Sequence, residues 1–454
     1  MPVFHRWPQL ALIARVFTAG MWPKKNIHAG VVDGKDVELP DRTYFSLFGY
    51  PVRNTGIEKP ALFLLLILIL QMIPFPHALT RLLSPDTAHI YEQAYGAAGA
   101  EPGWHPFSLD SFLTFSKFLE YSAYFMIYLV VQNGSPSGRY HRTILATFLL
   151  SAAFQAGYGL YEFLTNHHYI FFYEKTVNRE YATGTFINRN HYAAYLAMAV
   201  PLIFGIIAGY FTPLSRKENE PALSKLAIVL KMEGGKILLL LFIFGLIAPA
   251  IICSMSRGGI LSVFIASFVF LALYVRSNKR ASRAPIWLGL LLLGSAIVAI
   301  ATWEPLHARF EKMSEQFTAR RARTVIYADT ARIFLSFPLT GAGAGTFMQV
   351  FPAHRSFVAY DVYRYAHNDY LQLLAETGIA GLIFIAMLSF AIFSRLARIL
   401  MRAFGKTSVF QIGSFCSILT LALHSVTEFP LQIPAIVTSA TILSVLFMRT
   451  PSVK

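Results

Sequence analysis

The sequence contains little charge and little cysteine. Only 14% of its 454 residues are charged, whereas a soluble domain carries about 25%, so an ordinary soluble enzyme is excluded. Its two cysteines, Cys253 and Cys416, fall inside apolar runs without metal-like spacing, and we interpret them as small buried residues. The sequence has no HExxH motif, cysteine cluster or dense carboxylate loop. We therefore expect no metal site and no cofactor.

Apolar residues are abundant instead, and they gather in long runs. Hydrophobic residues make up 55% of the chain. Runs that approach the roughly 20 residues needed to cross a bilayer as a helix recur between residues 60 and 448. We predict an all-α polytopic membrane protein with about 10 to 12 transmembrane helices. The spans that can be delimited are 60–76, 112–131, 143–165, 191–211, 237–255, 260–274, 286–302, 371–394, 408–424 and 431–448.

The distribution of positive charge predicts the orientation of these spans. The formal net charge is +15, and 25 of the 39 lysines and arginines lie in the N-terminal segment and in alternate short loops. Such segments stay in the cytoplasm, which places the N-terminus inside. Because this bias accounts for the basic charge, we expect no nucleic acid as a partner. The long hydrophilic segment 303–370 then lies outside, with eight basic and six acidic residues.

We divide the chain into four parts on this basis. Residues 1–59 form a basic cytoplasmic or interfacial segment without the layout of a cleaved signal peptide. Residues 60–302 contain transmembrane helices 1–7, and residues 303–370 form one large outside loop. Residues 371–454 contain helices 8–10 and a short cytoplasmic tail. Within the first part, Leu10–Trp22 is too short to span the membrane and is compatible with a surface helix.

Polar clusters interrupt the apolar pattern at four places on the predicted outside face. They are residues 184–191, the tight turn 256–259, Arg323 together with the glycine run 341–345, and His367–Asp369. A fifth, weaker cluster is 424–430. His367–Asp369 can cap a helix that enters the membrane. The glycine run lacks the ending of a P-loop, so we interpret it as a loop that tolerates close backbone approach.

Arginine and histidine are the residues of these clusters with the clearest chemistry. Arg257 lies at a membrane edge, where a charge is costly unless it is paired or faces water. A guanidinium also binds two phosphate oxygens at once, while snorkelling to the interface is the competing interpretation. Histidine is the natural general base near neutral pH. Chemistry alone does not choose among the six on this face, which are His167, His168, His191, His354, His367 and His424.

These motifs, in this order, resemble the O-antigen ligase and O-antigen polymerase superfamily of bacterial envelope glycosyltransferases. The matching pieces are GTFINRNHYAAYLA, SRGG, RTVIYADTARIFLSFPLTGAGAGTF and HNDYLQLLAETGIAGL, and SLDSFLTFSKFLEYSAYF is similar to the family's entry into an early helix. The resemblance covers roughly residues 105–448. It implies a GT-C-like fold in the bacterial inner (cytoplasmic) membrane, with an active site that faces the periplasm.

The resemblance also implies roles for individual residues. The histidine of the HN motif is the proposed base of the family, and it matches His367. The arginines that bind diphosphate match Arg257 and, less closely, Arg189 and Arg323. We expect support from Asn188, Asn190, Asn368 and Glu428. At the position of Glu428 the family pattern leads us to expect aspartate.

The implied function is transfer of a glycan from undecaprenyl diphosphate to an acceptor hydroxyl, by an inverting and metal-independent route. Such a donor carries its own leaving group, so the protein needs charge stabilisation and a base. The acceptor stays open between lipid A–core (ligase), the next repeat unit (O-antigen or exopolysaccharide polymerase) and a protein (oligosaccharyltransferase). Membrane lipids are further expected partners. A flippase or transporter of lipid-linked sugars is the alternative from another class, although no inverted repeat is recognisable.

Overall fold

The structure of the chain is a computed structural model. It describes residues 30–32, 35–37, 44–47, 50–134, 138–212, 222–277, 316–358, 362–401 and 405–448. These residues are predominantly helical, which confirms the expected all-α class. The expected span 286–302 and the segment Leu10–Trp22 lie outside the described residues.

Several of the helices have the length and composition of membrane spans. Five of those that the structure describes are long and apolar enough to cross a membrane, and two shorter apolar helices follow them in the chain. The long ones are α6 (Gly138–Thr165), α7 (Arg189–Phe211), α8 (Ala222–Cys253), α9 (Arg257–Ser277) and α15 (Ile379–Leu400), and the short ones are α16 (Lys406–His424) and α17 (Pro434–Met448). The polytopic class is confirmed, while the total of 10 to 12 helices stays a prediction.

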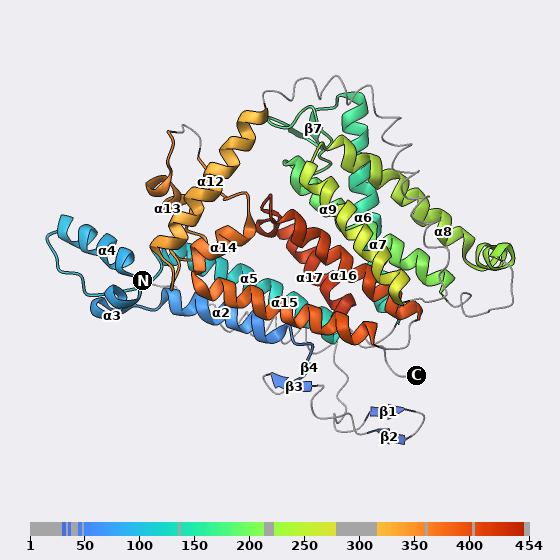
Figure 1. Cartoon of the computed structure of the whole chain (residues 1–454), viewed down its shortest axis with the longest axis horizontal. Coiled ribbons are helices and arrows are strands. Elements are labelled where there is room, and N and C mark those ends of the chain that lie inside the picture. Colours follow the sequence, from blue (N-terminus) through green and yellow to red (C-terminus); the bar gives the residue numbers. More distant parts are fainter. Residues whose placement is uncertain are drawn as a thin grey trace.

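The helices pack as two groups around a central pair (Figure 1). Helices α6, α7, α8 and α9 form one group, and α2 (Glu58–Met72), α5 (Ser111–Asn133) and α15 form the other. Helix α16 packs against α7 and α9, and α17 packs against α16 and α5. A Cβ atom on Gly205 of α7 would lie 3.0 Å from Cα of Gly413 in α16. Small residues therefore let these two helices approach closely.

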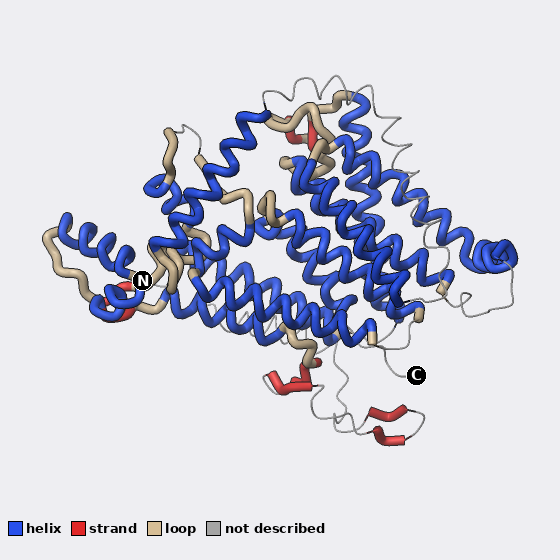
Figure 2. The backbone as a smooth tube through the Cα atoms, in the orientation of Figure 1, coloured by secondary structure: helices blue, strands red, loops and turns tan. Residues whose placement is uncertain are grey.

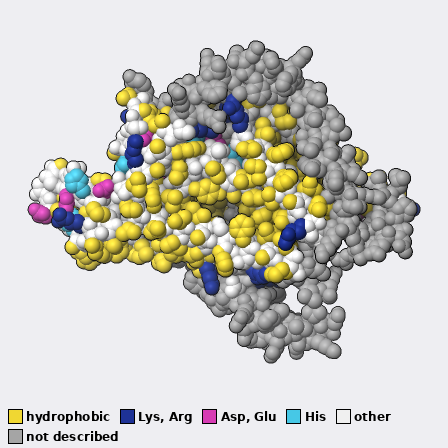
Figure 3. All heavy atoms as spheres, viewed as in Figure 1, with side chains coloured by type: hydrophobic (Ala, Val, Ile, Leu, Met, Phe, Trp, Pro, Cys, Tyr) yellow, Lys and Arg dark blue, Asp and Glu magenta, His cyan; other side chains and the backbone are white. Residues whose placement is uncertain are grey.

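Hydrophobic side chains cover the broad middle of the face in Figure 3, and charged side chains lie mainly toward its edges. Exposed apolar residues such as Leu238, Phe264 and Phe390 belong to spanning helices. A soluble protein rarely exposes so extensive an apolar surface. The distribution therefore fits helices whose outer faces contact lipid.

In the described part of the chain, short strands lie either before α2 or in the connections between helices (Figure 2). Each sheet is an antiparallel pair of strands. The pairs are β1 (Gly30–Val32) with β2 (Lys35–Val37), β3 (Tyr44–Leu47) with β4 (Tyr50–Arg53), β5 (Phe75–Pro76) with β6 (Trp104–His105), and β7 (Tyr169–Ile170) with β8 (Tyr173–Glu174). Between β5 and β6 lie α3 (His77–Leu83) and α4 (Pro85–Ala97).

The described part of the segment predicted as a long outside loop is largely helical. It contains α12 (Gln316–Ser336) and α13 (Phe347–His354). Ile326, Ile333 and Phe337 are buried together with Phe347 and Phe351. Because helical spacing aligns apolar residues on one face of α12, this segment forms a small core with α13 and with Ala375 of α14.

The expected eighth span is divided into two helices, which corrects the prediction of one continuous helix from residue 371. Helix α14 (Asp369–Thr377) ends at Gly378, and α15 begins at Ile379. Gly378 has a φ of +62°, and a Cβ there would lie 2.7 Å from the carbonyl group of Leu339. Only glycine fits this conformation and this contact easily.

The glycine run lies between the C-terminal ends of α2 and α14. Gln71 of α2 donates from Nε2 to the carbonyl oxygens of Thr340 (2.7 Å) and Glu376 (2.8 Å), and its Oε1 accepts from the amide of Ala344 at 3.1 Å. Gly341 has a φ of +69°, and a Cβ there would overlap the backbone of Glu376. The run thus permits the close backbone approach that was predicted.

We expect Gly341→Ala to destabilise the protein much more than Gly99→Ala. Gly99 has nearly the same φ, +68°, but no heavy atom lies within 4 Å of its added Cβ. Backbone strain at either site costs about 1 kcal/mol, and overpacking at Gly341 adds about 2 kcal/mol more. Thermal unfolding of the purified protein in detergent measures the difference. Equal melting temperatures for the two variants would contradict the packing argument.

Candidate functional site

Glu428 is the centre of a polar cluster built from distant parts of the sequence. It lies in the turn between α16 and η4 (Pro430–Gln432) and is only 2% exposed. Its Oε1 accepts hydrogen bonds from Nδ2 of Asn190 at 2.6 Å and from the guanidinium of Arg323. Its Oε2 lies 3.2 Å from Nδ1 of His367. Four of the predicted site residues are therefore in direct contact.

Two asparagine caps place the partners of Glu428. Asn188 caps α7, and its side chain accepts from the amide of Asn190 at 2.8 Å. Asn368 caps α14 by accepting from the amide of Leu371 at 3.0 Å, and its Nδ2 donates to the carbonyl of Val426 at 2.9 Å. Asparagine favours such positions because its oxygen satisfies a free helix amide. Asn188 and Asn368 therefore position their neighbours, whereas Asn190 contacts Glu428 itself.

His367 is held in an uncommon backbone conformation just before this cap. Its φ is +53°, and its carbonyl accepts from the hydroxyl of Tyr327 at 2.8 Å. Its ring meets Phe429 edge-on, with centroids 4.9 Å apart. Non-glycine residues in the left-handed region cost about 1–3 kcal/mol and concentrate at functional sites. With Nδ1 bound to a carboxylate, Nε2 is the nitrogen that can face a substrate.

The surroundings of Glu428 keep its carboxyl group ionised. Burial alone would raise the pKa of Glu428. The hydrogen bond from His367 and the positive charge of Arg323 outweigh burial and hold the pKa below its ordinary value. A carboxylate that stays charged at neutral pH can fix the orientation of an imidazole and stabilise its protonated form.

Arg189 and Arg257 are each the first residue of a helix beside this cluster. The guanidinium of Arg189 lies 3.9 Å from the centre of the Tyr181 ring. Arg257 is exposed at the start of α9. A Cβ on Gly258 would lie 2.6 Å from Oγ1 of Thr427, so glycine lets the start of α9 lie against the turn that carries Glu428. Two helix N-termini with arginines form a favourable environment for an anion.

Three neighbours of Glu428 were not singled out from the sequence: Phe429, His191 and His424. Phe429 lies between the rings of His191 (4.7 Å) and His367. His424 is fully buried, and neither of its ring nitrogens has a hydrogen-bond partner in the described part of the chain. The sequence put both histidines among six candidates, and only spatial proximity to Glu428 distinguishes them.

No group of three or more His, Cys, Asp or Glu side chains within the described ranges could hold a metal ion. The expectation that the reaction needs no metal stays a prediction.

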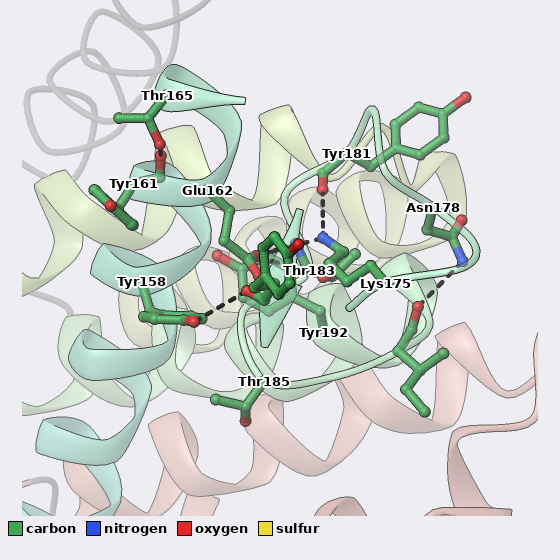
Figure 4. A network of polar contacts seen from close by, with 12 residues as sticks. Tyr158, Tyr161, Glu162, Thr165, Lys175, Asn178, Tyr181, Thr183, Thr185 and Tyr192 are labelled. Carbon is green, nitrogen blue, oxygen red and sulfur yellow. Dashed lines mark hydrogen bonds and ion pairs between the residues drawn. The ribbon is translucent and has the colours of Figure 1, made fainter. Parts of the chain in front are cut away.

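A buried ion pair holds the connection between α6 and α7, which leads to Asn188 and Arg189 (Figure 4). Nζ of Lys175 lies 3.6 Å from Oε2 of Glu162, and both side chains are at most 2% exposed. Lys175 also donates to the carbonyl of Tyr181 at 3.5 Å, and the amide of Thr183 donates to Glu162 at 3.4 Å. Burial lowers the pKa of Lys175, although the charge of Glu162 opposes this effect. The pair fixes the connection on α6.

We expect Glu162→Gln to destabilise the protein by about 3 kcal/mol, because it leaves Lys175 buried without a counter-charge. The matched control is Glu174→Gln in the same connection. Glu174 pairs with Arg179 at 2.7 Å, but both side chains are roughly half exposed, and such pairs contribute at most about 1 kcal/mol. Thermal unfolding of both variants measures the contrast. A loss no larger in Glu162→Gln than in the control would refute the role of the buried pair.

Comparison with known families adds one finding. Residues 237–386 match the family model described as O-antigen ligase, and this confirms the superfamily resemblance. The matched stretch includes Arg257, Arg323 and His367. No curated protein matches the chain.

Proposed function

We propose, from the premise that this chain carries an O-antigen ligase domain, that it is a glycosyltransferase that moves a glycan from undecaprenyl diphosphate to a hydroxyl of lipid A–core. The match supports the broader class of O-antigen ligase or polymerase. The observation that carries the proposed transfer reaction is the contact of His367 and Arg323 with one buried carboxylate, beside two helix starts that bear arginine.

His367 acts as the base in this proposal. Nε2 accepts the proton of the acceptor hydroxyl while the hydroxyl oxygen attacks the anomeric carbon. The bond from that carbon to the diphosphate oxygen breaks, and its electron pair leaves with the diphosphate. Glu428 stabilises the imidazolium through Nδ1, 3.2 Å away. Attack from the face opposite the leaving group inverts the anomeric centre.

Arg189 and Arg257 stabilise the leaving diphosphate. Each begins a helix whose free amides and dipole favour negative charge. Arg323 is already paired with Glu428, so its main role is to hold that carboxylate, and its share in diphosphate binding is smaller than the resemblance implies. We place the site on the periplasmic face of the inner membrane, in agreement with the charge distribution of the short loops.

The test is a product assay with the purified protein in lipid vesicles. The vesicles contain undecaprenyl diphosphate bearing a labelled glycan, together with lipid A–core. We expect label on the core, release of an equal amount of undecaprenyl diphosphate, and no effect of a metal chelator. A lengthened lipid-linked glycan would indicate a polymerase, and a labelled protein acceptor would indicate protein glycosylation. Movement of the intact lipid across the bilayer would indicate a transporter and overturn the proposal.

A further inference from the structure

An elongated apolar cavity of about 390 Å³ lies among α2, α5, α15, α16 and α17. Its wall on α17 consists of Val437, Ala440, Thr441 and Ser444, which share one face of that helix because of their spacing. Helices α2, α5 and α15 each contribute a similar face. Seven residues of helix rise about 10 Å, so the cavity extends along the helices. This shape suits a linear hydrocarbon chain.

One end of the cavity is polar and adjoins the candidate site. Asp369, Glu376 and Gln432 line this end, and Asp369 is the second residue after His367. Nζ of Lys117 donates to Oε1 of Gln432 at 3.0 Å and to Oε2 of Glu120 at 2.9 Å, so a paired lysine lies at the same end. The cavity therefore joins an apolar chain site to a place where a polar head group can be bound.

Asp369 carries an unsatisfied polar atom at this junction. Its side chain is 4% exposed, and its Oδ2 accepts from the amide of Leu431 at 2.9 Å. Its Oδ1 is buried and has no hydrogen-bond partner among the described residues. Burial raises the pKa of Asp369 to about 7, although the amide of Leu431 and the nearby side chains of Ser425 and Gln432 oppose the rise. The carboxyl can thus hold a proton, and a buried polar atom without a partner costs about 1–3 kcal/mol.

We propose that the cavity binds the isoprenoid chain of the lipid-linked donor next to its diphosphate, and that Asp369 donates a hydrogen bond from Oδ1 to an oxygen of the head group. This inference rests on the proposed function, because it names the subsite for a part of that donor. A protonated carboxyl carries no negative charge to repel an anionic head group, and its O–H can donate a hydrogen bond to that group. The bound oxygen in turn satisfies Oδ1.

The donor fits this cavity better than the acceptor does. In the donor, the hydrocarbon chain is joined directly to the diphosphate that leaves the reacting carbon. In lipid A–core, sugars separate the acyl chains from the accepting hydroxyl. Asp369 and Gln432 at the polar end lie two and four residues from His367 and Glu428, which contact each other, so the cavity suits a lipid whose chain begins close to its reacting atom.

The test compares two identical substitutions on α17. Ala440→Phe fills the cavity, whereas Ala435 is exposed on the same helix and Ala435→Phe serves as the control. Each variant receives the polyprenyl donor and an analogue with a methyl group in place of the chain. We expect Ala440→Phe to lower the preference for the polyprenyl donor, as a ratio of kcat/KM values, by about tenfold. The control should keep the wild-type preference.

A binding measurement separates this inference from the proposed function. An isoprenoid diphosphate with a photoactivatable group near its head should label α5 and α17 in the wild-type protein. Unlabelled polyprenyl diphosphate should compete, whether or not transfer occurs. Asp369→Asn, which keeps a donor group, should retain labelling, and Asp369→Ala should lose most of it. If Ala440→Phe does not fold, Ala61→Leu on the opposite wall replaces it.

Two results would overturn the inference. One is labelling that does not saturate or that falls equally on the outer faces of the helices. The other is an unchanged chain preference in the cavity-filling variant. Specific labelling without glycan transfer would support the binding site for the chain but contradict the proposed transfer reaction.

Discussion

The variant His367→Ala is expected to lower kcat for glycan transfer by about 10³-fold, within the range that general-base catalysis contributes. No other described side chain combines contact with the ionised Glu428 with a ring nitrogen left over for substrate. The loss should appear in kcat rather than in KM, since a base acts on the transition state. The vesicle assay with labelled donor measures both constants.

His354→Ala provides the matched control for His367→Ala. His354 belongs to the same segment, residues 303–370, but its ring nitrogens lie near the carbonyl of Val350 (3.1 Å) and the hydroxyl of Ser336 (3.3 Å). Its removal should leave kcat unchanged. If the two variants behaved alike, or if His367→Ala kept full activity, His367 would not be the base.

A variant at Glu428 tests whether His367 acts together with this carboxylate or alone. Glu428→Gln keeps the size of the side chain but removes the charge that stabilises an imidazolium. Because the pKa of Glu428 is held below its ordinary value, the carboxylate stays ionised throughout the neutral range. The depressed pKa stabilises the fold at neutral pH, and this stabilisation is lost only when the pH falls through the folded-state pKa.

The sequence predicted much of the helical framework, because apolar runs of sufficient length are a local signal. Helices α7 and α9 lie where the spans were expected. The division at Gly378 was missed because it depends on contact with Leu339, which belongs to another segment. The core of α12 and α13 was missed for a related reason. Polar composition suggested a loop, and only the structure shows that the apolar face of α12 packs against α13 and α14.

The candidate site was predicted as separate motifs rather than as a cluster. The sequence and the resemblance selected His367, Arg323 and Asn190, but local patterns could not show that all three contact Glu428, which lies 61 or more residues from each of them. The family pattern predicts aspartate at the position of Glu428, so the resemblance alone did not indicate its central place. Asp369 was interpreted only as part of a helix cap, since no sequence pattern shows that one of its oxygens lacks a partner.

Arg257→Ala is the second variant for which we expect a large loss. If Arg257 stabilises the charge that develops on the diphosphate, its removal should lower kcat/KM by about 10²-fold or more, as for other preorganised charge-stabilising groups. Arg257→Lys should recover only part of the activity, because an ammonium does not bind two phosphate oxygens in the geometry of a guanidinium.

The control for Arg257→Ala is on the same helix. Arg276 lies in the last turn of α9, at the end opposite Arg257, and is exposed. Arg276→Ala should therefore leave kcat/KM unchanged. Product inhibition adds a measurement that a general loss of folding would not reproduce. Undecaprenyl diphosphate should inhibit Arg257→Ala more weakly than the wild type but inhibit His367→Ala normally, since the base does not contact the leaving group. Equal product affinity in wild type and Arg257→Ala would place the diphosphate elsewhere and leave Arg189 as the arginine to test.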